Sequence, residues 1–316
     1  MNICLAGSTG FIGSVIAQTA RESGEHVVTA VKAPRISGPG MTEPVSAARD
    51  WVAGHRADFQ RLVDSLCGDV AINAAGLAAP ASGDAAGLRG ANAVWPAVMS
   101  LACREAAVPR LVHVSSAAVQ GRRDPLDEST EHEPFSCYTR SKAEGESALL
   151  RLGEAGRGVR QLVVYRPTSV QGAGRRTTAT LVRLSRLRHL PVTDGGRQQL
   201  PLILVADVAR ACLLLAGTST PPLIALHPWE GMTTAQLLEW LAPGTPRLDL
   251  PPPVVRAVLR CVRTGGQLSG RGRALSRQLD LLYLGQRIDA QALRDRGYAS
   301  ATGIEDWQRL ARSVDR

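Results

Sequence analysis

The sequence predicts an α/β protein in which helices cover both faces of a doubly wound parallel sheet, with a smaller, mostly helical C-terminal lobe. Two observations support this fold class. Short β-branched runs alternate with helical patterns in the first half, and the connections between the runs are too long for hairpins. From Pro243 onward the alternation is lost, and Pro and Arg are frequent. A chain of 316 residues, 44% of them hydrophobic, can bury one large core and a secondary lobe.

The expected elements follow in chain order. A strand at residues 2–6 leads into a helix that begins at Phe11, and a strand at 26–31 leads into a Gly- and Pro-rich loop at 34–44. Further strands and intervening helices are expected at residues 69–76, 92–106, 110–116, 147–156 and 161–167.

The next apolar run ends at Val205 and is expected to add another strand to the sheet. A helix is expected from about Val208, with Asp207 capping its N-terminus. The Arg-rich remainder, which includes the segment 251–266, is expected to form the smaller lobe.

The segment Gly7–Gly13, GSTGFIG, lies between the first strand and an amphipathic helix. One glycine would permit a tight turn, one would let the backbone approach a pyrophosphate, and one would let the helix pack closely on the strand. The helix N-terminus would then face the anion. In this context the segment predicts a dinucleotide-binding turn rather than an ordinary tight turn.

The spacing Gly7-x-x-Gly10-x-x-Gly13 resembles that of extended short-chain dehydrogenases, specifically the NAD(P)-dependent epimerase/dehydratase family. The resemblance extends along most of the chain up to Glu230. It implies a dinucleotide-binding Rossmann domain and a substrate-binding lobe. The implied boundaries are 1–168 for the Rossmann domain, with its sheet completed by about 199–226, and 169–198 with 227–316 for the lobe.

The resemblance also implies cofactor contacts beyond the glycine turn, from a strand end at Asn73, a helix asparagine and the Arg-Pro segment that begins at Arg166. Asp50 is a further candidate for contact with the adenine. The expected cofactor-binding residues are Gly7, Ser8, Thr9, Gly10, Phe11, Ile12, Gly13, Lys32, Arg35, Asn73, Ala74, Ala75, Gly76, Asn92, Lys142, Pro167 and Thr168.

The end of the second strand bears on the choice of cofactor. Val31 is followed by Lys32 and, shortly after, by Arg35. Enzymes that select NAD usually carry Asp or Glu here to bind the ribose 2′-hydroxyl, whereas a cation suits a 2′-phosphate. NADP(H) is therefore favoured, and NAD(H) remains the alternative.

A tyrosine and a lysine four residues apart, Tyr138 and Lys142, share one face of an expected helix. Free tyrosine has a pKa of about 10, roughly three units too high for acid–base work at neutral pH, and the Lys142 ammonium is available to lower it. Ser115 and Ser116 end a strand at the sheet edge where such folds bind ligands. The family motif places the catalytic serine before an Ala-x-Val-x-Gly segment, which selects Ser116. The resemblance thus implies hydride transfer in which Tyr138 exchanges the proton and Ser116 orients the oxygen.

Two alanines restrict the reaction. Ala117 and Ala118 stand where the nucleotide-sugar 4,6-dehydratases of this family carry an Asp-Glu pair that performs the elimination. Simple oxidoreduction or C4 epimerisation remains. An epimerase retains tightly bound NAD, whereas Lys32 indicates exchangeable NADPH, so an enzyme that reduces a keto group, or oxidises the corresponding alcohol, is favoured. The alternatives are a nucleotide-sugar C4 epimerase and, more remotely, a non-catalytic redox sensor, a class that typically lacks the Tyr-Lys pair.

The leading substrate is a nucleotide sugar, closely followed by a carbonyl intermediate of specialised metabolism. Relatives that bind nucleoside-diphosphate sugars place an arginine where Leu200 stands here, and Arg197 is the nearest candidate. Other candidate diphosphate ligands are Arg175, Arg176 and Arg183. The expected substrate contacts are Ser116, Tyr138, Arg175 and Arg197.

The net charge of +9 comes mostly from arginine, without the aromatic-interleaved basic motif of a nucleic-acid module. Nucleic acid is therefore not an expected partner, whereas an anion-binding role and an ordinary basic surface both remain open. A homodimer is one further candidate assembly, and an acidic carrier protein is another. The arginines that would bind such a carrier are Arg256, Arg260, Arg263, Arg271 and Arg273.

The six cysteines are scattered singly, which predicts neither a metal site nor a disulfide framework, and they are expected to be reduced packing residues. No export signal and no apolar run of about 18 residues is present. The expected location is the cytoplasm, with no membrane partner.

Overall fold

We describe the computed structural model of the chain for residues 1–36, 43–78, 84–186, 190–266 and 270–314. Residues 37–42 of the expected loop lie outside this range. None of the helices in these residues combines the length and hydropathy that a bilayer crossing requires. Of the six cysteines, Cys4, Cys103 and Cys212 are buried and the other three are exposed, so only half are packing residues.

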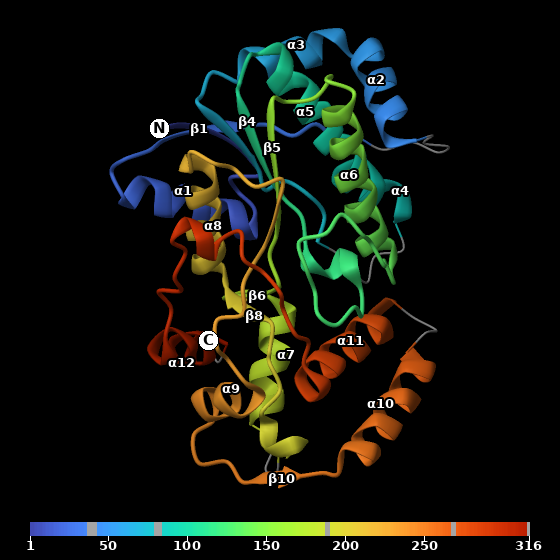
Figure 1. The fold of residues 1–316 in the computed structure, drawn as a ribbon, viewed down its shortest axis with the longest axis vertical. Helices are drawn as coiled ribbons and strands as arrows, with labels where there is room; N and C mark the ends of the chain where they lie inside the picture. Colours follow the sequence, from blue (N-terminus) through green and yellow to red (C-terminus); the bar gives the residue numbers. More distant parts are fainter. Residues whose placement is uncertain (37–42, 79–83, 187–189, 267–269, 315–316) are drawn as a thin grey trace.

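A six-stranded parallel sheet forms the centre of the larger part of the molecule, with strand order β2-β1-β3-β4-β5-β9 (Figure 1). Its strands are β1 Asn2–Ala6, β2 Val27–Val31, β3 Val70–Asn73, β4 Arg110–Val114, β5 Gln161–Arg166 and β9 Ile224–Leu226. At the carboxyl edge Ala6 lies beside both Val31 and Asn73, and Asn73 lies beside His113. The ends of several strands therefore meet at one edge, as the expected fold requires.

Helices cover both faces of this sheet. Along β1, side chains alternate between two cores because successive residues of a strand point to opposite faces. Ile3 and Leu5 join one core with α1 (Phe11–Glu22) and α8 (Val205–Gly217). Cys4 and Ala6 join the other. The helices of that second face are α2 Pro44–Gly54, α3 Arg56–Asp64, α5 Trp95–Glu105 and α6 Cys137–Glu154. The doubly wound α/β class is confirmed.

The run that ends at Val205 does not join this sheet, so that expectation was wrong. Residues Leu202–Leu204 form β8, which pairs with β6 (Ser169–Gln171) in a separate two-stranded sheet. After β5 the chain leaves the main sheet and forms β6, with which β8 later pairs. The chain returns to the main sheet only after α8, where β9 is the sixth strand. Apolar content alone does not distinguish these two pairings.

Asp207 does not cap α8, which already begins at Val205. Its buried carboxylate accepts hydrogen bonds from Ser300 Oγ and the Ala301 amide, both at 3.3 Å, and from the Thr302 hydroxyl. Asp207 therefore anchors a segment near the C-terminus to the helix, a contact between residues far apart in sequence.

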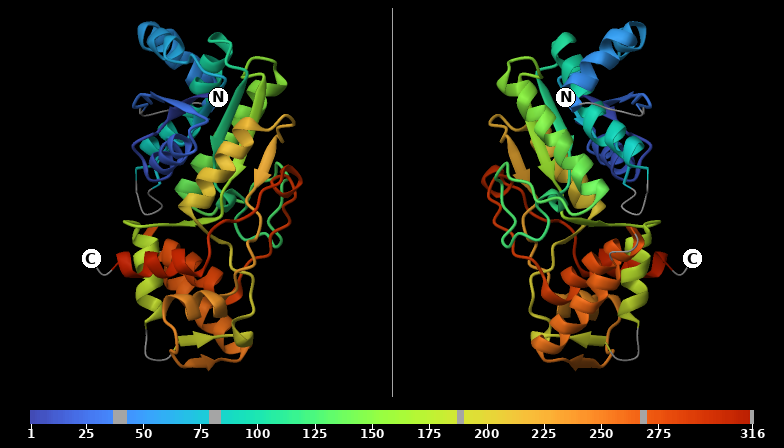
Figure 2. Two further views of the ribbon diagram at one scale, coloured as in Figure 1. Left: turned by 90° about the vertical axis from the view of Figure 1, so that its left-hand side faces the viewer. Right: turned by 90° about the vertical axis from the view of Figure 1, so that its right-hand side faces the viewer.

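A smaller lobe lies below the sheet in Figures 1 and 2 and is mostly helical. Leu181, Leu237, Leu282 and Trp307 contribute to its own hydrophobic core. Ala292 and Leu293, by contrast, pack in the core of the main sheet and connect the two parts. The remaining elements are α4 Ala85–Arg89, α7 Arg176–Ser185, β7 Leu190–Val192, α9 Thr234–Leu241, β10 Arg247–Asp249, α10 Pro252–Gly266, α11 Gly270–Leu284 and α12 Ile304–Ser313, with short helical turns at Gly90–Val94, Ala117–Gln120, Asp194–Gly196 and Arg294–Arg296.

Candidate active site

The glycine turn between β1 and α1 has the shape that a dinucleotide requires. Gly7 has a φ of +83°, and a Cβ there would lie 2.6 Å from the Ala75 amide nitrogen. A Cβ on Gly13 would lie 2.1 Å from the Gly7 carbonyl oxygen. Gly10 is the N-cap of α1 and provides no side-chain cap, so the first N–H groups of the helix have no capping partner. Ser8 and Thr9 lie in the turn itself. The turn therefore leaves a helix N-terminus suited to an anion.

The segment expected at the nicotinamide end has an unsatisfied polar group. Pro167 and Thr168 directly follow β5, and both are buried. The Thr168 hydroxyl has no hydrogen-bond partner among the residues that the structure describes. A buried polar atom without a partner costs free energy, and a bound polar ligand would remove that cost. The residues present thus fit a dinucleotide at this edge of the sheet.

Two buried asparagines hold the backbone segment that lines this site. Asn73 Oδ1 accepts hydrogen bonds from the Ala75 amide at 3.2 Å and from Trp95 Nε1 at 3.0 Å. Asn92 bonds both the amide and the carbonyl of Leu77 at 3.0 Å, and it donates to Ser141 Oγ at 3.0 Å. Both amides are engaged with protein groups and hold the segment 74–77 in place; their contact with a cofactor stays a prediction.

Tyr138 is placed in the first turn of α6 by a capping box. Ser136 Oγ accepts a hydrogen bond from the Thr139 amide at 3.1 Å, and Thr139 Oγ1 accepts one from the Ser136 amide at 2.9 Å. The same geometry orients the helix so that Lys142 and Glu146 continue the face on which Tyr138 lies.

Ser116 lies opposite that face, two residues after the end of β4. Its hydroxyl oxygen accepts a hydrogen bond from the Ala118 amide at 3.2 Å, which starts a short helical turn and holds the side chain at the strand end. Burial raises the pKa of Tyr138, whereas the charge of Arg175 and the hydrogen bond with Ser116 lower it. The structure therefore brings Ser116 and Tyr138 together. In this structure the cation that lowers the pKa of Tyr138 is Arg175, and the expected action of Lys142 on the tyrosine stays a prediction.

The Lys142 ammonium donates a hydrogen bond to the Val114 carbonyl at 3.0 Å. A Cβ on Gly76 would lie 3.3 Å from Lys142 Nζ and 2.7 Å from Asn92 Oδ1, so these three expected cofactor residues meet at one point. Burial lowers the pKa of Lys142 to about 8, although the charge of Glu146 raises it. Lys142 is thus an ammonium at neutral pH, beside the segment expected to line the cofactor.

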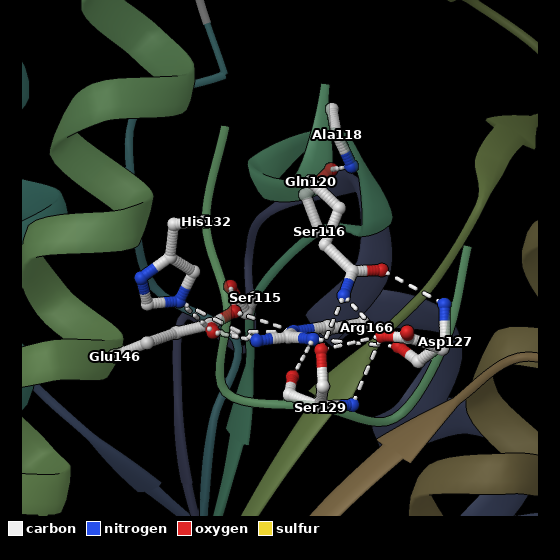
Figure 3. A network of polar contacts seen from close by, with 9 residues as sticks. All are labelled: Ser115, Ser116, Ala118, Gln120, Asp127, Ser129, His132, Glu146 and Arg166. Carbon is white, nitrogen blue, oxygen red and sulfur yellow. Dashed lines mark hydrogen bonds and ion pairs between the residues drawn. The ribbon is translucent and has the colours of Figure 1, made fainter. Parts of the chain in front are cut away.

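A buried ion pair that the sequence analysis missed lies directly behind the site (Figure 3). Glu146 and Arg166 are both completely buried, and Arg166 Nη2 lies 2.6 Å from Glu146 Oε2. His132 Nε2 lies 2.8 Å from the same oxygen, and Arg166 Nη1 donates to the Ser129 carbonyl at 2.7 Å. Burial alone would raise the pKa of Glu146, but the hydrogen bonds from His132, Arg166 and Ser115 together with the Arg166 charge hold it at about 2. The sequence does contain one signal for this ion pair: Glu146 lies four residues after Lys142, just as Lys142 lies four residues after Tyr138.

This ion pair also distinguishes the two neighbouring serines. The Ser115 hydroxyl is buried and donates to Glu146 Oε1. Ser116 is only half-buried and lies on the side of Tyr138. The geometry supports Ser116 as the serine that faces a substrate, and it gives Ser115 a structural role.

The expected substrate arginines are not brought together. The Arg175 guanidinium lies over the Phe11 ring, 4.7 Å from its centroid, and Nη1 donates to the Val170 carbonyl at 3.4 Å. Arg175 therefore lies beside the glycine turn and Tyr138. Arg197 is instead 75% exposed and forms an ion pair with Asp194. Leu200 is buried in the core of the smaller lobe.

The other residues considered for ligand contact are on the surface. Arg176 and Arg183 are exposed on α7, and Asp50 is exposed on α2. Lys32 and Arg35 are exposed just beyond the end of β2, and no ion pair joins either of them to a carboxylate of the described residues. Lys32 and Arg35 are therefore available to an anionic ligand.

Comparisons with known proteins identify the family. The model of the NAD dependent epimerase/dehydratase family matches residues 3–222. A 4-hydroxy-2-methyl-3-oxo-4-farnesyl-3,4-dihydroquinoline-1-oxide ketoreductase of Stigmatella aurantiaca is 30% identical over 232 residues. That match covers 68% of this chain and 64% of the relative, so the chain matches less than two thirds of that relative's length.

Sterol demethylase protein B of Methylococcus capsulatus (strain ATCC 33009 / NCIMB 11132 / Bath) is 26% identical over 277 residues, covering 82% of this chain and 80% of the relative. Among solved structures, UDP-glucuronic acid 4-epimerase from Bacillus cereus in complex with NAD has the same fold, with a TM-score of 0.67, 16% identity, and coverage of 100% of this chain and 99% of that one. The chain belongs to the NAD dependent epimerase/dehydratase family and is an NAD(P)-dependent oxidoreductase.

Proposed function

We propose that the protein is an NADPH-dependent reductase of a ketone in specialised metabolism. One observation carries this proposal: beside the dinucleotide turn the site presents one proton-exchanging group, Tyr138, with Ser116 next to it. Ala117 and Ala118 replace the acid pair that an elimination needs. The buried carboxylate of Glu146, on the same helix as Tyr138, is already ionised and held by Arg166. Such a site can protonate one oxygen but cannot also remove and return a carbon-bound proton.

The residues of the chain then have distinct roles. The bound dinucleotide would supply the hydride that reaches the carbonyl carbon. Ser116 donates a hydrogen bond to the carbonyl oxygen, and Tyr138 transfers its phenolic proton to that oxygen as negative charge develops there. The raised pKa of Tyr138 suits this direction, because the phenol remains protonated at neutral pH. Solvent returns the proton to the phenolate after product release.

A lipophilic ketone is the substrate class that we favour over a nucleotide sugar. A diphosphate is commonly bound by several converging arginines, but Arg197 is exposed and paired with Asp194 while Arg175 lies on Phe11. The two relatives matched over most of the chain are named for a farnesyl-dihydroquinoline oxide and for sterols. A nucleotide-sugar C4 epimerase is the second candidate, because Arg175, a candidate ligand of a substrate diphosphate, lies close to Tyr138.

One assay separates the two candidates. The protein is incubated with NADPH and hydrophobic cyclic ketones, or with NAD and UDP-sugars, and both NADPH fluorescence and the sugar products are followed. A reductase consumes one NADPH for each ketone reduced. An epimerase instead interconverts UDP-sugars without net NADPH consumption, and that result would replace the proposal.

Ser116→Ala is expected to lower the rate of ketone reduction by about a hundredfold to a thousandfold, since it removes a hydrogen bond to the developing charge. Ser115→Ala is the matched control. It should leave the rate near that of the wild type and instead lower stability by about 1–3 kcal/mol, because Glu146 loses a donor. Steady-state rates and urea unfolding of both variants measure the two effects. The opposite order of rates would assign the substrate-facing role to Ser115.

The preference for NADPH rests on the exposed cations after β2. NADPH is expected to bind at least about tenfold more tightly than NADH, which corresponds to about 1.4 kcal/mol. Lys32→Ala should remove most of this difference by weakening the binding of NADPH alone. Arg21→Ala, which removes an exposed arginine of α1, is the control and should leave the difference unchanged. Fluorescence titration measures the affinities of the wild type and both variants for NADPH and NADH. Equal affinities in the wild type would exclude the preference.

A further inference from the structure

The guanidinium of Arg175 has more hydrogen-bonding capacity than the surrounding protein uses. The side chain is only partly exposed, and its one hydrogen bond within the described part of the chain is from Nη1 to the Val170 carbonyl, at 3.4 Å. A guanidinium carries five N–H donors, so most of them have no acceptor there. Burial lowers the pKa of Arg175, and the phenol of Tyr138 acts in the opposite direction. No carboxylate of the described residues contributes, so this partly buried cation lacks an anion.

A tight turn after β6 brings this guanidinium over the glycine turn of the dinucleotide site. The Arg175 amide donates a hydrogen bond to the Gly172 carbonyl at 3.4 Å, and Gly174 within the turn has a φ of +78°. The Gly172 amide donates to Thr178 Oγ1 at 3.1 Å, which connects the turn to the start of α7. A Cβ on Gly172 would lie 2.7 Å from the Phe11 ring, so glycine allows the turn to pack on that ring.

The ring of Phe11 holds the guanidinium at the N-terminus of α1. Arg175 Cζ lies 4.7 Å from the ring centroid, and Phe11 is the first residue of α1, directly after the N-cap Gly10. This cation–π contact provides no oxygen acceptor for the N–H groups. The partial positive charge of the helix N-terminus and the charge of Arg175 are therefore neighbours. Two neighbouring positive groups repel each other unless an anion binds to both.

We propose that Arg175 binds the pyrophosphate of the nicotinamide dinucleotide. The planar guanidinium fork matches phosphate oxygens and can bind two of them at once. The turn Gly7–Gly13 offers backbone N–H groups but contains no charged side chain, and Arg175 would supply that charge from the segment after β6. The proposal rests on the family's use of NAD(P) and needs neither ketone reduction nor a preference for NADPH.

This assignment differs from the sequence-based expectation that Arg175 contacts the substrate. Three anionic groups are candidates for the guanidinium: the cofactor pyrophosphate, an anionic group of the substrate and the Tyr138 phenolate. The contact with Phe11 favours the first, because Phe11 belongs to the turn that fits the dinucleotide. A diphosphate of a nucleotide sugar would then lose its candidate ligand near Tyr138, which favours a substrate without that group.

Arg175 also differs from the arginines that were expected to bind an acidic carrier. Arg256 and Arg260 are exposed on α10, where water solvates them, and Arg263 lies 3.5 Å from Asp280. The side chains of Arg271 and Arg273 lie outside the described residues. Binding of a carrier by this group stays a prediction.

The test is calorimetric titration of the full chain with NADPH and with NADH, without substrate. Arg175→Gln should weaken both dinucleotides by about tenfold to a hundredfold, because both contain the pyrophosphate. Lys32→Ala, by contrast, should weaken NADPH alone. Arg175→Lys keeps the charge without the fork, so both affinities should fall by a smaller factor. Adenosine 2′,5′-bisphosphate lacks the pyrophosphate, and Arg175→Gln should weaken it less than NADPH.

Arg21→Gln is the matched control, because it removes one exposed arginine at the other end of α1. It should bind both dinucleotides like the wild type, and thermal melts without cofactor should show every variant folded. Unchanged affinities in Arg175→Gln, or an equal loss in the control, would overturn the proposal. With unchanged affinities, a raised KM for the ketone would assign Arg175 to the substrate, and a shifted pH profile would assign it to Tyr138. If the protein reduced no ketone, the measured affinities would still decide the role of Arg175.

Discussion

Tyr138→Phe is expected to lower the rate of ketone reduction by about two to four orders of magnitude, the range typical of a positioned acid–base group. The reason is that the variant keeps the ring but removes the phenolic proton donor that the structure places beside Ser116. Cofactor affinity and the free energy of unfolding should remain close to those of the wild type. Single-turnover rates with bound NADPH measure the chemical step directly.

Tyr283→Phe is the matched control, because Tyr283 lies on α11 and packs beside the core of the smaller lobe. Its rate should equal that of the wild type. If Tyr138→Phe retained most of its activity, Tyr138 would have a structural role and the proton would have to come from another group. The pH dependence adds a second check: burial raises the pKa of Tyr138, so the rate of reduction should not fall on passing from acid to neutral pH for lack of the phenolic proton.

Glu146→Gln is expected to lower the free energy of unfolding by about 3–5 kcal/mol, the usual cost of removing one partner of a buried ion pair. The substitution leaves the Arg166 guanidinium buried and without its anion, and it weakens the contacts of His132 and Ser115 as well. Urea unfolding followed by circular dichroism measures the change. A loss below about 1 kcal/mol would show that the ion pair contributes little.

The surface pair Arg89–Glu144 provides the control, with an Nε–Oε2 distance of 2.8 Å and both side chains partly exposed. Glu144→Gln should cost only about 0–1 kcal/mol, because water solvates the remaining charge.

The same ion pair predicts how stability depends on pH. The pKa of Glu146 is about 2 in the folded chain and about 4.5 in the unfolded chain, so the unfolded state binds more protons between these values. The stability contributed by Glu146 is therefore present above about pH 4.5 and is lost as pH falls towards 2. Glu146→Gln should lack this component of the acid transition. Unfolding curves at several acid pH values compare the two proteins.

Features encoded by neighbouring residues could be predicted from the sequence. The turn Gly7–Gly13 requires its glycines because a Cβ at two of the positions would collide with backbone atoms, and this constraint is local. Tyr138 and Lys142 share a helix face through their spacing alone. The alternation of buried strands and amphipathic helices likewise predicts a parallel sheet, because strands with both faces covered must be apolar throughout.

Contacts between distant segments were decided only by the tertiary structure. The partner of Glu146 is Arg166 on β5, and no spacing rule connects a helix residue to the end of a later strand. The same limit explains why β8 was assigned to the wrong sheet and why the effect of Arg175 on the pKa of Tyr138 was not predicted. Periodicity specifies which side of an element is buried, whereas the identity of the neighbour depends on how the whole chain packs. In this chain the packing buries the Glu146 carboxylate, and the Arg166 guanidinium beside it neutralises its charge.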